Sequence, residues 1–414
     1  MIPIDNLAIR IAPSFRGTLE AGQEQIEYRT SFPVGLRFHC LPGCGLCCKT
    51  YRIPLTSSDL SRLRRVVEPE ACSSIAFENE SERSGIAGFM ENGKVEGCCY
   101  LDNNSSCSVY ESRPLYCRTY PLIRDTYAVL EMSMDHTCPG VGGGNIVTTE
   151  QIEEAFLLEA EHRPESLNVR ESSANYDVIC GSLKARGVYT DVELVRAVCA
   201  GLIQHGLTSR PGCEISAFFN RAAAALAVLL ADTSNILSRE ASTRLIDGLE
   251  NHLYRNPADP AKSSPITFSE QEEPLRVCLD DGYVPRHLLV YQNRRFFVRD
   301  AKTVLGEIDP GSLEGNELSE SAVDSLADYL VEWMSRQALL RFVHITALAR
   351  PHRVNVLQSF FEFLVYVVSR VLITAEVLRK HKKQQNVTPR VMQEAIRGND
   401  GPLRRKCASV VSRY

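Results

Sequence analysis

Apolar residues recur at every third or fourth position over long parts of the chain, which is the period of an amphipathic helix. The clearest cases are residues 190–206, 214–237, 321–342 and 354–381. Gly206 and the "RPG" sequence at 210–212 break the first two runs into separate helices. We therefore predict two mainly helical domains, residues 146–258 and 316–414.

Shorter patterns predict a few strands. In "KTYRIPL" (49–55) the residues Tyr51, Ile53 and Leu55 alternate onto one face, as in a strand. The sequence "RHLLVYQNRRFFVRD" (286–300) indicates two short strands around "QN", a β-hairpin. A turn-rich stretch at 254–265 precedes it. The chain is thus expected to be an α-rich α+β protein.

Three helix starts can be predicted from capping residues. Thr56 or Ser57 can cap a helix in "TSSDLSRLRRVV", and Thr148 and Gln151 have the spacing of a capping box. Near the C-terminus, Thr388 and Pro389 fit the N-cap and first position of another helix. The predicted domain organisation is a cysteine-rich domain at 1–145, a helical domain at 146–258, a linker with the hairpin at 259–315, and a helical domain at 316–414.

The net charge of the 414-residue chain is −5, so overall charge does not favour nucleic acid as a partner. Local basic clusters could still contact phosphates, and another protein is the partner we expect. These clusters contain Arg379, Lys380, Lys382, Lys383, Arg404, Arg405 and Lys406. The apolar stretches at 222–231 and 363–369 are shorter than the roughly 18 residues of a membrane span, and no signal peptide is recognisable, so a cytoplasmic location is expected.

Cysteine is concentrated near the N-terminus, where ten of the 15 cysteines lie between Cys40 and Cys138. A disulfide framework is typical of small secreted domains, and it does not suit a long chain with an odd number of cysteines. Clustered thiols in such a chain indicate metal ligands. The scattered cysteines, such as Cys199 in an apolar helical run, are interpreted as small buried hydrophobes.

The spacing of the clustered thiols leaves two models open, one site of four thiolates or two sites that share eight cysteines. In extended backbone, neighbouring cysteines such as Cys47 and Cys48 point to opposite sides and would serve different sites. His39 and His136 flank the cluster and are interpreted as surface or core residues. An all-sulfur ligand set suits structural zinc or an iron–sulfur cluster, and spacing alone does not choose between them.

Two further features bear on the chemistry. Thiolates around a metal carry net negative charge, and Arg113 and Arg118 could donate to sulfur or to a carboxylate that holds the fold. The glycine-rich sequence "CPGVGGGN" (138–145) could approach a nucleotide, but no strand directly precedes its glycines, which favours a simple turn. Electron transfer and a catalytic free thiol are further alternatives, the latter without an obvious Cys/His/Asp pattern.

Three blocks of sequence, "CLPGCGLCC" (40–48), "CYLDNNSSCSVYESRPLYCRTYP" (99–121) and "CPGVGGG" (138–144), resemble successive blocks of the cysteine-cluster (CxxCxxCC) family. This family of zinc- or iron-chelating domains includes flagellin lysine-N-methylases. The resemblance covers about residues 36–145. By this resemblance eight cysteines would be metal ligands, namely Cys40, Cys44, Cys47, Cys48, Cys99, Cys107, Cys117 and Cys138, with Cys72 and Cys98 as extras.

The resemblance also implies a function. The three residues between Cys40 and Cys44 are similar to the spacing in the methylase branch, which implies S-adenosylmethionine-dependent methylation of a protein lysine. The family and the Cys138–Pro139 pair, which resembles ferredoxin ligand runs, favour an iron–sulfur cluster over zinc. The alternative is a non-enzymatic binding module that folds around its metal and uses its helical region to hold a partner.

Overall fold

The chain forms two compact units in a computed structural model, residues 13–174 and a helical unit that contains residues 175–414. The structure describes residues 14–21, 24–50, 53–66, 75–77, 88–90, 98–102, 104–162, 169–189, 275–277, 287–292, 295–300, 303–308, 318–349 and 356–411, with single positions between 192 and 207.

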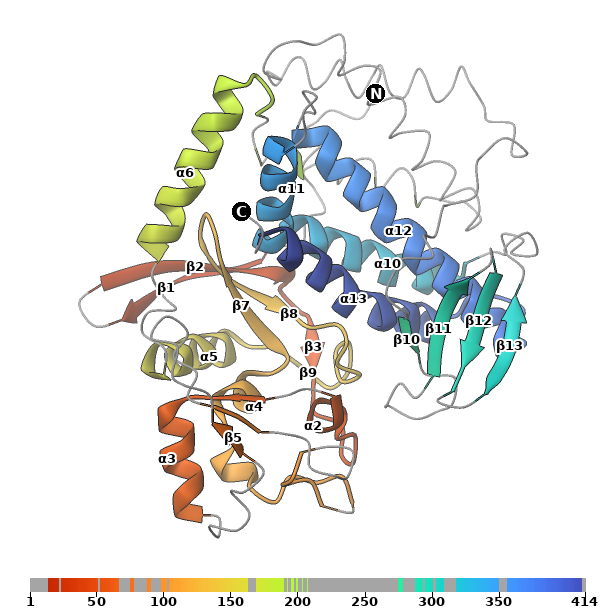
Figure 1. Ribbon diagram of the computed structural model, residues 1–414, viewed down its shortest axis with the longest axis horizontal. Helices are drawn as coiled ribbons and strands as arrows, with labels where there is room; N and C mark the ends of the chain where they lie inside the picture. Colours follow the sequence, from red (N-terminus) through yellow and green to blue (C-terminus); the bar gives the residue numbers. More distant parts are fainter. Residues whose placement is uncertain are drawn as a thin grey trace. The chain divides into compact units, whose positions relative to one another are not determined.

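A four-stranded mixed sheet forms the centre of the first unit. Its strands, in spatial order, are β1 (Ser14–Ala21), β2 (Glu24–Pro33), β8 (Leu130–Met134) and β7 (Leu122–Thr126). Strands β1 and β2 form an antiparallel hairpin, whereas β2 pairs in parallel with β8, about a hundred residues further on. Helix α5 (Thr149–His162) packs beside these strands (Figure 1) and joins them in one buried core with Phe32, Met132 and Phe156.

The rest of this unit consists of short elements joined by loops. A three-stranded sheet contains β4 (Ile53–Leu55), β6 (Gly88–Met90) and β5 (Ile75–Phe77), and β3 (Arg37–Phe38) pairs with β9 (Asn145–Ile146). The helices are α2 (Leu46–Thr50), α3 (Ser57–Val66), the 3₁₀ turn η3 (Tyr110–Ser112) and α4 (Leu115–Thr119). Their apolar residues form a separate small core around Leu55, Leu63 and Tyr100.

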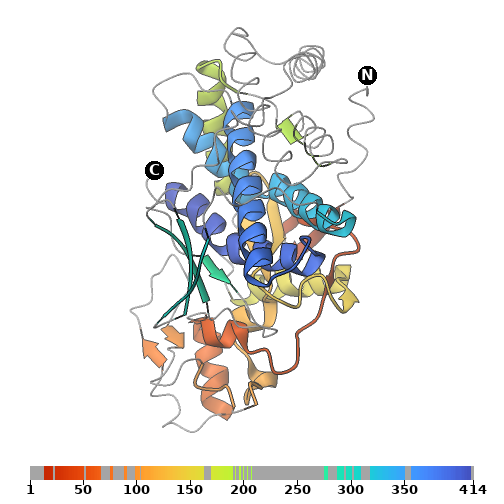
Figure 2. The same ribbon diagram turned by 90° about the vertical axis from the view of Figure 1, so that its right-hand side faces the viewer.

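The helical unit is built on a large apolar core. Its long helices are α6 (Val169–Ala185, which begins in the first unit), α10 (Glu320–Ser335), α11 (Gln337–Ala349), α12 (Val356–His381) and α13 (Pro389–Val411). An antiparallel sheet runs in the order β10 (Leu275–Val277), β11 (His287–Gln292), β12 (Arg295–Arg299) and β13 (Val304–Ile308). Strand β10 packs against α13, and α12 crosses the unit as its longest described helix (Figures 1 and 2).

The α-rich α+β fold class is confirmed. The capping predictions are also confirmed. The Thr148 hydroxyl accepts from the Gln151 N–H at 3.4 Å, the Gln151 side chain accepts from the Thr148 N–H at 3.1 Å, and the Thr388 hydroxyl accepts from Val391 N–H at 3.4 Å. The predicted hairpin is formed by β11 and β12. It lies inside a four-stranded sheet whose outer strands, β10 and β13, were not predicted.

Some predictions lie outside the described residues, among them the helix at 214–237, the linker at 254–265, and the side chains of Tyr51 and Cys72. The four predicted domains, with their three boundaries, stay a prediction. The mixed sheet of the first unit was not predicted, although β2 and β8 both alternate apolar and polar residues. Its pairing could not be inferred from local pattern, because β2 finds its partner β8 about a hundred residues further along the chain.

Helix α12 is long and apolar enough to cross a membrane by length and composition, with a mean hydropathy of 1.7 over its most apolar window. In the structure, however, 72% of that window is buried. Arg370, Thr374 and Glu376 are also buried along this helix and bind within the unit. These are features of a core helix in a globular unit.

Several residues of the basic clusters bind inside the helical unit. The Arg379 guanidinium contacts Glu376 at 3.0 Å and donates to the carbonyl of Gln384 at 2.8 Å. Lys382 donates to Glu394 at 2.6 Å. In this respect the clusters are helix-end contacts, as is common for basic residues in the last turn of a helix.

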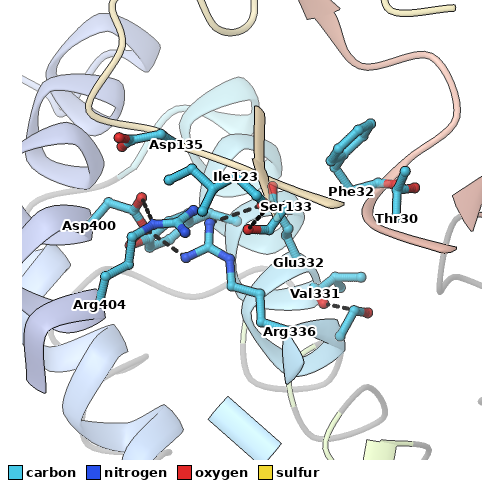
Figure 3. A network of polar contacts seen from close by, with 12 residues as sticks. Thr30, Phe32, Ile123, Ser133, Asp135, Val331, Glu332, Arg336, Asp400 and Arg404 are labelled. Carbon is cyan, nitrogen blue, oxygen red and sulfur yellow. Dashed lines mark hydrogen bonds and ion pairs between the residues drawn. The ribbon is translucent and has the colours of Figure 1, made fainter. Parts of the chain in front are cut away.

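A buried ion network joins α10 to α13 (Figure 3). Asp400 accepts from the Arg336 guanidinium at 2.8 Å, from the Tyr329 hydroxyl at 3.0 Å and from Arg404 Nε at 2.9 Å. Arg336 also donates to Glu332 at 2.9 Å and lies 4.3 Å over the ring of Trp333. Burial disfavours the charged guanidinium, but the two carboxylates outweigh it and raise the pKa of Arg336 above its ordinary value.

We predict that the helical unit loses stability in mild acid through His344. The imidazole is fully buried and stacks at 5.8 Å from Tyr176, and burial lowers its pKa from 6.5 to about 4. Between these values the unfolded chain takes up a proton that the folded chain does not, so stability falls as the pH falls, by about 3 kcal/mol in total. Urea titrations followed by Trp333 fluorescence at pH 7 and pH 4.5 measure this. In His344→Phe the pH dependence should shrink by most of that amount, and an unchanged slope would contradict the assignment.

Candidate metal centre

The first group of thiols lies on a tight loop that leads into helix α2. Gly43 and Gly45 have positive φ angles of 70° and 57°, which only glycine adopts without strain. This loop turns the chain so that α2 begins at Leu46 and carries both Cys47 and Cys48. The prediction of extended backbone here is wrong. Because the segment is helical, the two sulfurs lie on one side, 4.0 Å apart.

The second group of thiols reaches the first through Cys98. The Cys98 N–H donates to the carbonyl of Cys48 at 2.7 Å. The Cys98 side chain is half-buried and packs with Cys117 against the small core, whereas Cys99 is exposed in the following turn. The structure therefore brings Cys98 toward the cluster, although the family resemblance selected Cys99.

Cys107 follows a loop that folds back on α2. The Asp102 carboxylate accepts from the N–H groups of Asn104 and Ser106 at 2.8 Å and 2.7 Å, and Leu101 and Cys107 form a β-bridge. Lys49 extends from α2 to donate to the Ser105 hydroxyl at 2.7 Å. The loop is thus tied to the helix that carries Cys47 and Cys48.

Cys117 lies on the short helix α4, which is held by a buried carboxylate. Asp59 forms a capping box with Thr56, as its N–H donates to the Thr56 hydroxyl at 3.1 Å and its carboxylate accepts from the Thr56 N–H at 3.0 Å. The same carboxylate accepts from the N–H of Leu115 at 3.0 Å, at the start of α4. Asp59 therefore satisfies free N–H groups at two helix starts, although Leu115 lies 56 residues after it.

We expect Asp59→Ala to destabilise the first unit by about 2–3 kcal/mol, because it removes a cap and leaves buried donors without their acceptor. The variant should also loosen α4 and with it Cys117. Ser61→Ala is the matched control, since Ser61 lies on the exposed side of the same helix and should change stability by less than about 0.5 kcal/mol. Urea denaturation followed by far-UV circular dichroism compares the two. Equal midpoints would refute the role of Asp59.

Cys138 begins the glycine-rich loop, and this loop closes on His39. A Cβ atom at Gly140 would lie 2.0 Å from the His39 carbonyl oxygen, and one at Gly144 would lie 2.5 Å from the His39 Cβ. The His39 N–H donates to the Gly140 carbonyl at 3.3 Å, next to the β3–β9 pair. Glycine is needed at these positions because His39 packs against the loop. The need for glycine therefore does not support a nucleotide site here.

We predict a graded effect of alanine in this loop. Gly140→Ala forces a backbone clash and should cost about 3 kcal/mol, at the upper end of overpacking, or displace Cys138 from its position. Gly143→Ala meets only the edge of the His39 ring, at 3.1 Å, and should cost clearly less. Thermal unfolding of both variants ranks them. If Gly143→Ala were the more damaging, the packing of His39 in the loop would be misassigned.

The thiols from these segments act on one another electrostatically, with Cys47 at the centre. A hydrogen bond from the Cys48 thiol lowers the pKa of Cys47 to about 7 and raises that of Cys48. The pKa values of Cys117 and Cys138 are both raised to about 12, mainly by burial, with the charge of Cys47 among the smaller causes. The pKa values of Cys40 and Cys107 are also raised, first by burial and to a smaller extent by the charge of Cys47.

A second set of interactions connects Cys98 to the same group. The pKa of Cys48 is raised by its hydrogen bond with the Cys47 thiol, by burial and by the charges of Cys47, Cys98 and Cys117. The pKa of Cys98 is raised by its hydrogen bond with Cys99, by burial and by the charge of Cys117. The charge of Cys44 also raises the pKa of Cys138. The choice between one site and two sites stays open.

The donor set fits a soft metal or an iron–sulfur cluster in its chemistry, because many thiols gather and thiolate is the ligand that both prefer. None of the described cysteines forms a disulfide bond. As arranged, no three described His, Cys, Asp or Glu side chains converge closely enough to hold an ion. The identity of the individual ligands stays a prediction.

These features define a cysteine-cluster domain, built from short elements and rich in soft metal ligands. Residues 39–139 match the family model CxxCxxCC, described as "Putative zinc- or iron-chelating domain". This part of the chain is therefore a domain of that family, as the resemblance predicted, and the match spans about a quarter of the 414 residues. Comparisons with curated proteins and with solved structures gave no match.

Two structural features near the cysteines were not predicted from the sequence. Cys98 was taken as an extra, and the apolar residues that follow Cys99 could have suggested that one thiol of the pair packs against a core, as Cys98 does. The contact between His39 and the glycines could not be found from local pattern, because Gly140 and Gly144 lie about a hundred residues after His39.

Proposed function

We propose that the CxxCxxCC domain binds an inorganic centre through cysteine thiolates and that this centre holds its short elements together. The proposal is supported by the family match over residues 39–139 and by contacts between cysteines of separate segments. The sulfurs of Cys47 and Cys48 lie 4.0 Å apart, the Cys98 N–H donates to the Cys48 carbonyl, and Cys98 and Cys117 pack against the same small core. Free thiols in such a group repel one another once ionised, and a bound cation removes this cost.

The proposed ligands are Cys40, Cys44, Cys47, Cys48, Cys107, Cys117 and Cys138, with Cys98 in the place first given to Cys99. When bound, zinc would supply structural cross-linking, and an iron–sulfur cluster would add electron-transfer chemistry. The chain's own residues hold the ligands in place through the loop glycines, Asp59 and the contact of Cys98 with Cys48.

We favour an iron–sulfur cluster over zinc. The gathered thiols outnumber the four that a structural zinc ion takes. Cys138 is followed by Pro139, as is the last cysteine of bacterial ferredoxin runs. Protein purified without oxygen should then be brown, with iron and acid-labile sulfide in stoichiometric amounts. Colourless protein with stoichiometric zinc would overturn the preference for iron, and protein that retains neither metal would overturn the proposal itself.

The ligand assignment can be tested on the wild-type chain. Alkylation of the metal-loaded protein, followed by peptide fragmentation in the mass spectrometer, reports which thiols are protected. Cys98 should be protected and Cys99 should react. The exposed Cys99 and the half-buried Cys98 lie in one peptide, so each is the internal control of the other. Protection of Cys99 with reaction at Cys98 would restore the original assignment.

We propose lysine methylation as a separate activity that the metal proposal does not need. Its support is the spacing of Cys40 and Cys44, which is similar to that of the methylase branch. Calorimetry of the metal-loaded protein with S-adenosylmethionine tests it. Binding in the micromolar range would support the activity, and no heat at high ligand concentration would favour the non-enzymatic module, in which the helical unit holds a protein partner.

A further inference from the structure

Two positively charged side chains of the helical unit converge on the ring of Tyr366. The Nζ atom of Lys406, from α13, lies 3.6 Å from the centre of this ring. Arg370, four residues after Tyr366 on α12, places its guanidinium carbon 5.5 Å from the same centre, and its Nη1 donates to the Tyr366 hydroxyl at 3.0 Å. Helices α12 and α13 therefore each bring one positive charge to one aromatic side chain.

The guanidinium of Arg370 is fixed in place by hydrogen bonds between the two helices. Its Nε donates to the Asn399 amide oxygen at 3.1 Å. The Asn399 amide nitrogen donates in turn to the Thr374 hydroxyl at 3.1 Å and to the Ala395 carbonyl at 2.8 Å. Both Arg370 and Asn399 are buried. Because the donor is already ordered, less entropy is lost when a ligand binds to it.

The surroundings disfavour both positive charges. Burial lowers the pKa of Arg370 to about 10. Burial, and after it the charge of Arg370, lowers the pKa of Lys406. Arg336, in the same unit, shows the opposite effect, because two carboxylates raise its pKa. Two cations that share one ring and repel each other are stabilised when an anion binds to both.

The cations are accessible from one side. Lys406 is exposed and Tyr366 is half-buried, so an anion can approach both from solvent. Burial raises the pKa of Tyr366 to about 12, so its hydroxyl keeps its proton and can donate to an anion. Two positive charges and a hydroxyl donor match a doubly charged oxyanion, such as a phosphate group, better than a singly charged carboxylate.

We propose that Lys406, Arg370 and Tyr366 form a binding site for the phosphate group of a small molecule. The site belongs to the helical unit, and the inference is independent of the proposed metal centre. It gives a role to Lys406, a member of the basic clusters of the sequence, whereas Arg379 and Lys382 of these clusters bind carboxylates within the unit.

Calorimetric titration of the full chain with inorganic phosphate tests the site. The wild type should show saturable binding. Lys406→Gln removes the exposed charge and should weaken binding by about tenfold or more, the usual effect of losing a hydrogen bond to a charged group. Lys383→Gln is the matched control and should bind like the wild type. It also removes an exposed charge, but Lys383 lies after the end of α12, about 20 Å along the helix from Tyr366.

Further titrations identify the ligand. Acetate at equal ionic strength should bind much more weakly than phosphate, and equal affinity would overturn the assignment to a doubly charged anion. Glycerol phosphate should bind at least as well as inorganic phosphate, and its rejection would overturn the assignment to a phosphate on a larger molecule.

Two results would overturn the site itself, namely no saturable phosphate binding by the wild type, or equal binding by the wild type and Lys406→Gln. Tyr366→Phe decides the case in which Lys406→Gln does not fold. This variant keeps the ring and removes only the hydroxyl donor, so it should lose a smaller part of the affinity. Unchanged binding in Tyr366→Phe would then count against the site.

Discussion

Removal of the metal should unfold the cysteine segments of residues 39–139 and leave the helical unit intact. Among the described residues, these segments share only a small core around Leu55, Leu63 and Tyr100, which is little apolar burial for so many loops. Structural zinc sites supply on the order of 10–16 kcal/mol of binding free energy to small domains, and that energy becomes folding energy. This is the largest effect that we expect from any single change.

Hydrogen exchange with and without a chelator measures this effect by segment. The amides of Cys98 and Leu115, which bind Cys48 and Asp59, should lose protection. Trp333 is the one tryptophan of the chain and is fully buried in the helical unit, so its fluorescence should stay constant. Chelator already saturated with zinc is the control. Unchanged protection at Cys98 and Leu115 would show that the domain folds without a metal.

Asp400→Ala should destabilise the helical unit by about 3–5 kcal/mol, the usual cost of leaving buried charges without their partner. Asp400 binds Arg336, Arg404 and Tyr329. Its side chain is completely buried, and the side chain of Arg336 is 1% exposed. The variant would leave the Arg336 guanidinium with Glu332 as its remaining carboxylate among these contacts. The network joins α10 to α13, so its loss should loosen the packing of both helices.

Glu307→Ala is the matched control, because it breaks an ion pair with Arg295 in which both side chains are largely exposed (56% and 42%). Such pairs contribute about 0–1 kcal/mol. Urea denaturation followed by Trp333 fluorescence reports both variants on the same unit, since Arg336 lies over the Trp333 ring. An Asp400→Ala midpoint close to that of Glu307→Ala would mean that the network contributes little net stability.

The parts of the fold that sequence predicts well are those determined by near neighbours. Thr148 with Gln151 and Thr56 with Asp59 are three residues apart, and each pair fixes a helix start by itself. The parallel pairing of β2 with β8 depends on residues about a hundred positions apart, so the alternation within each strand does not reveal it. Propensity alone does not reveal such pairing.

The candidate centre shows the same division. The motif spacing was enough to predict the family and a group of gathered cysteines. It could not decide between Cys98 and Cys99, because that choice depends on which thiol faces the core containing Tyr100 and Cys117. It also misjudged Cys47 and Cys48, since a turn with two positive-φ glycines starts a helix where a strand was assumed.

The mixed sheet has a consequence for how this domain can be separated or exchanged. Strands β7 and β8 lie inside the segment that matches the family, but β2, the parallel neighbour of β8, lies before that segment and α5 lies after it. Excision at residues 39 and 139 would remove β2 and leave one edge of β8 unpaired, and such an edge can pair with another molecule. A self-sufficient fragment must run from about residue 13 to about 174, and any recombination that transplants this motif has to carry both flanks with it.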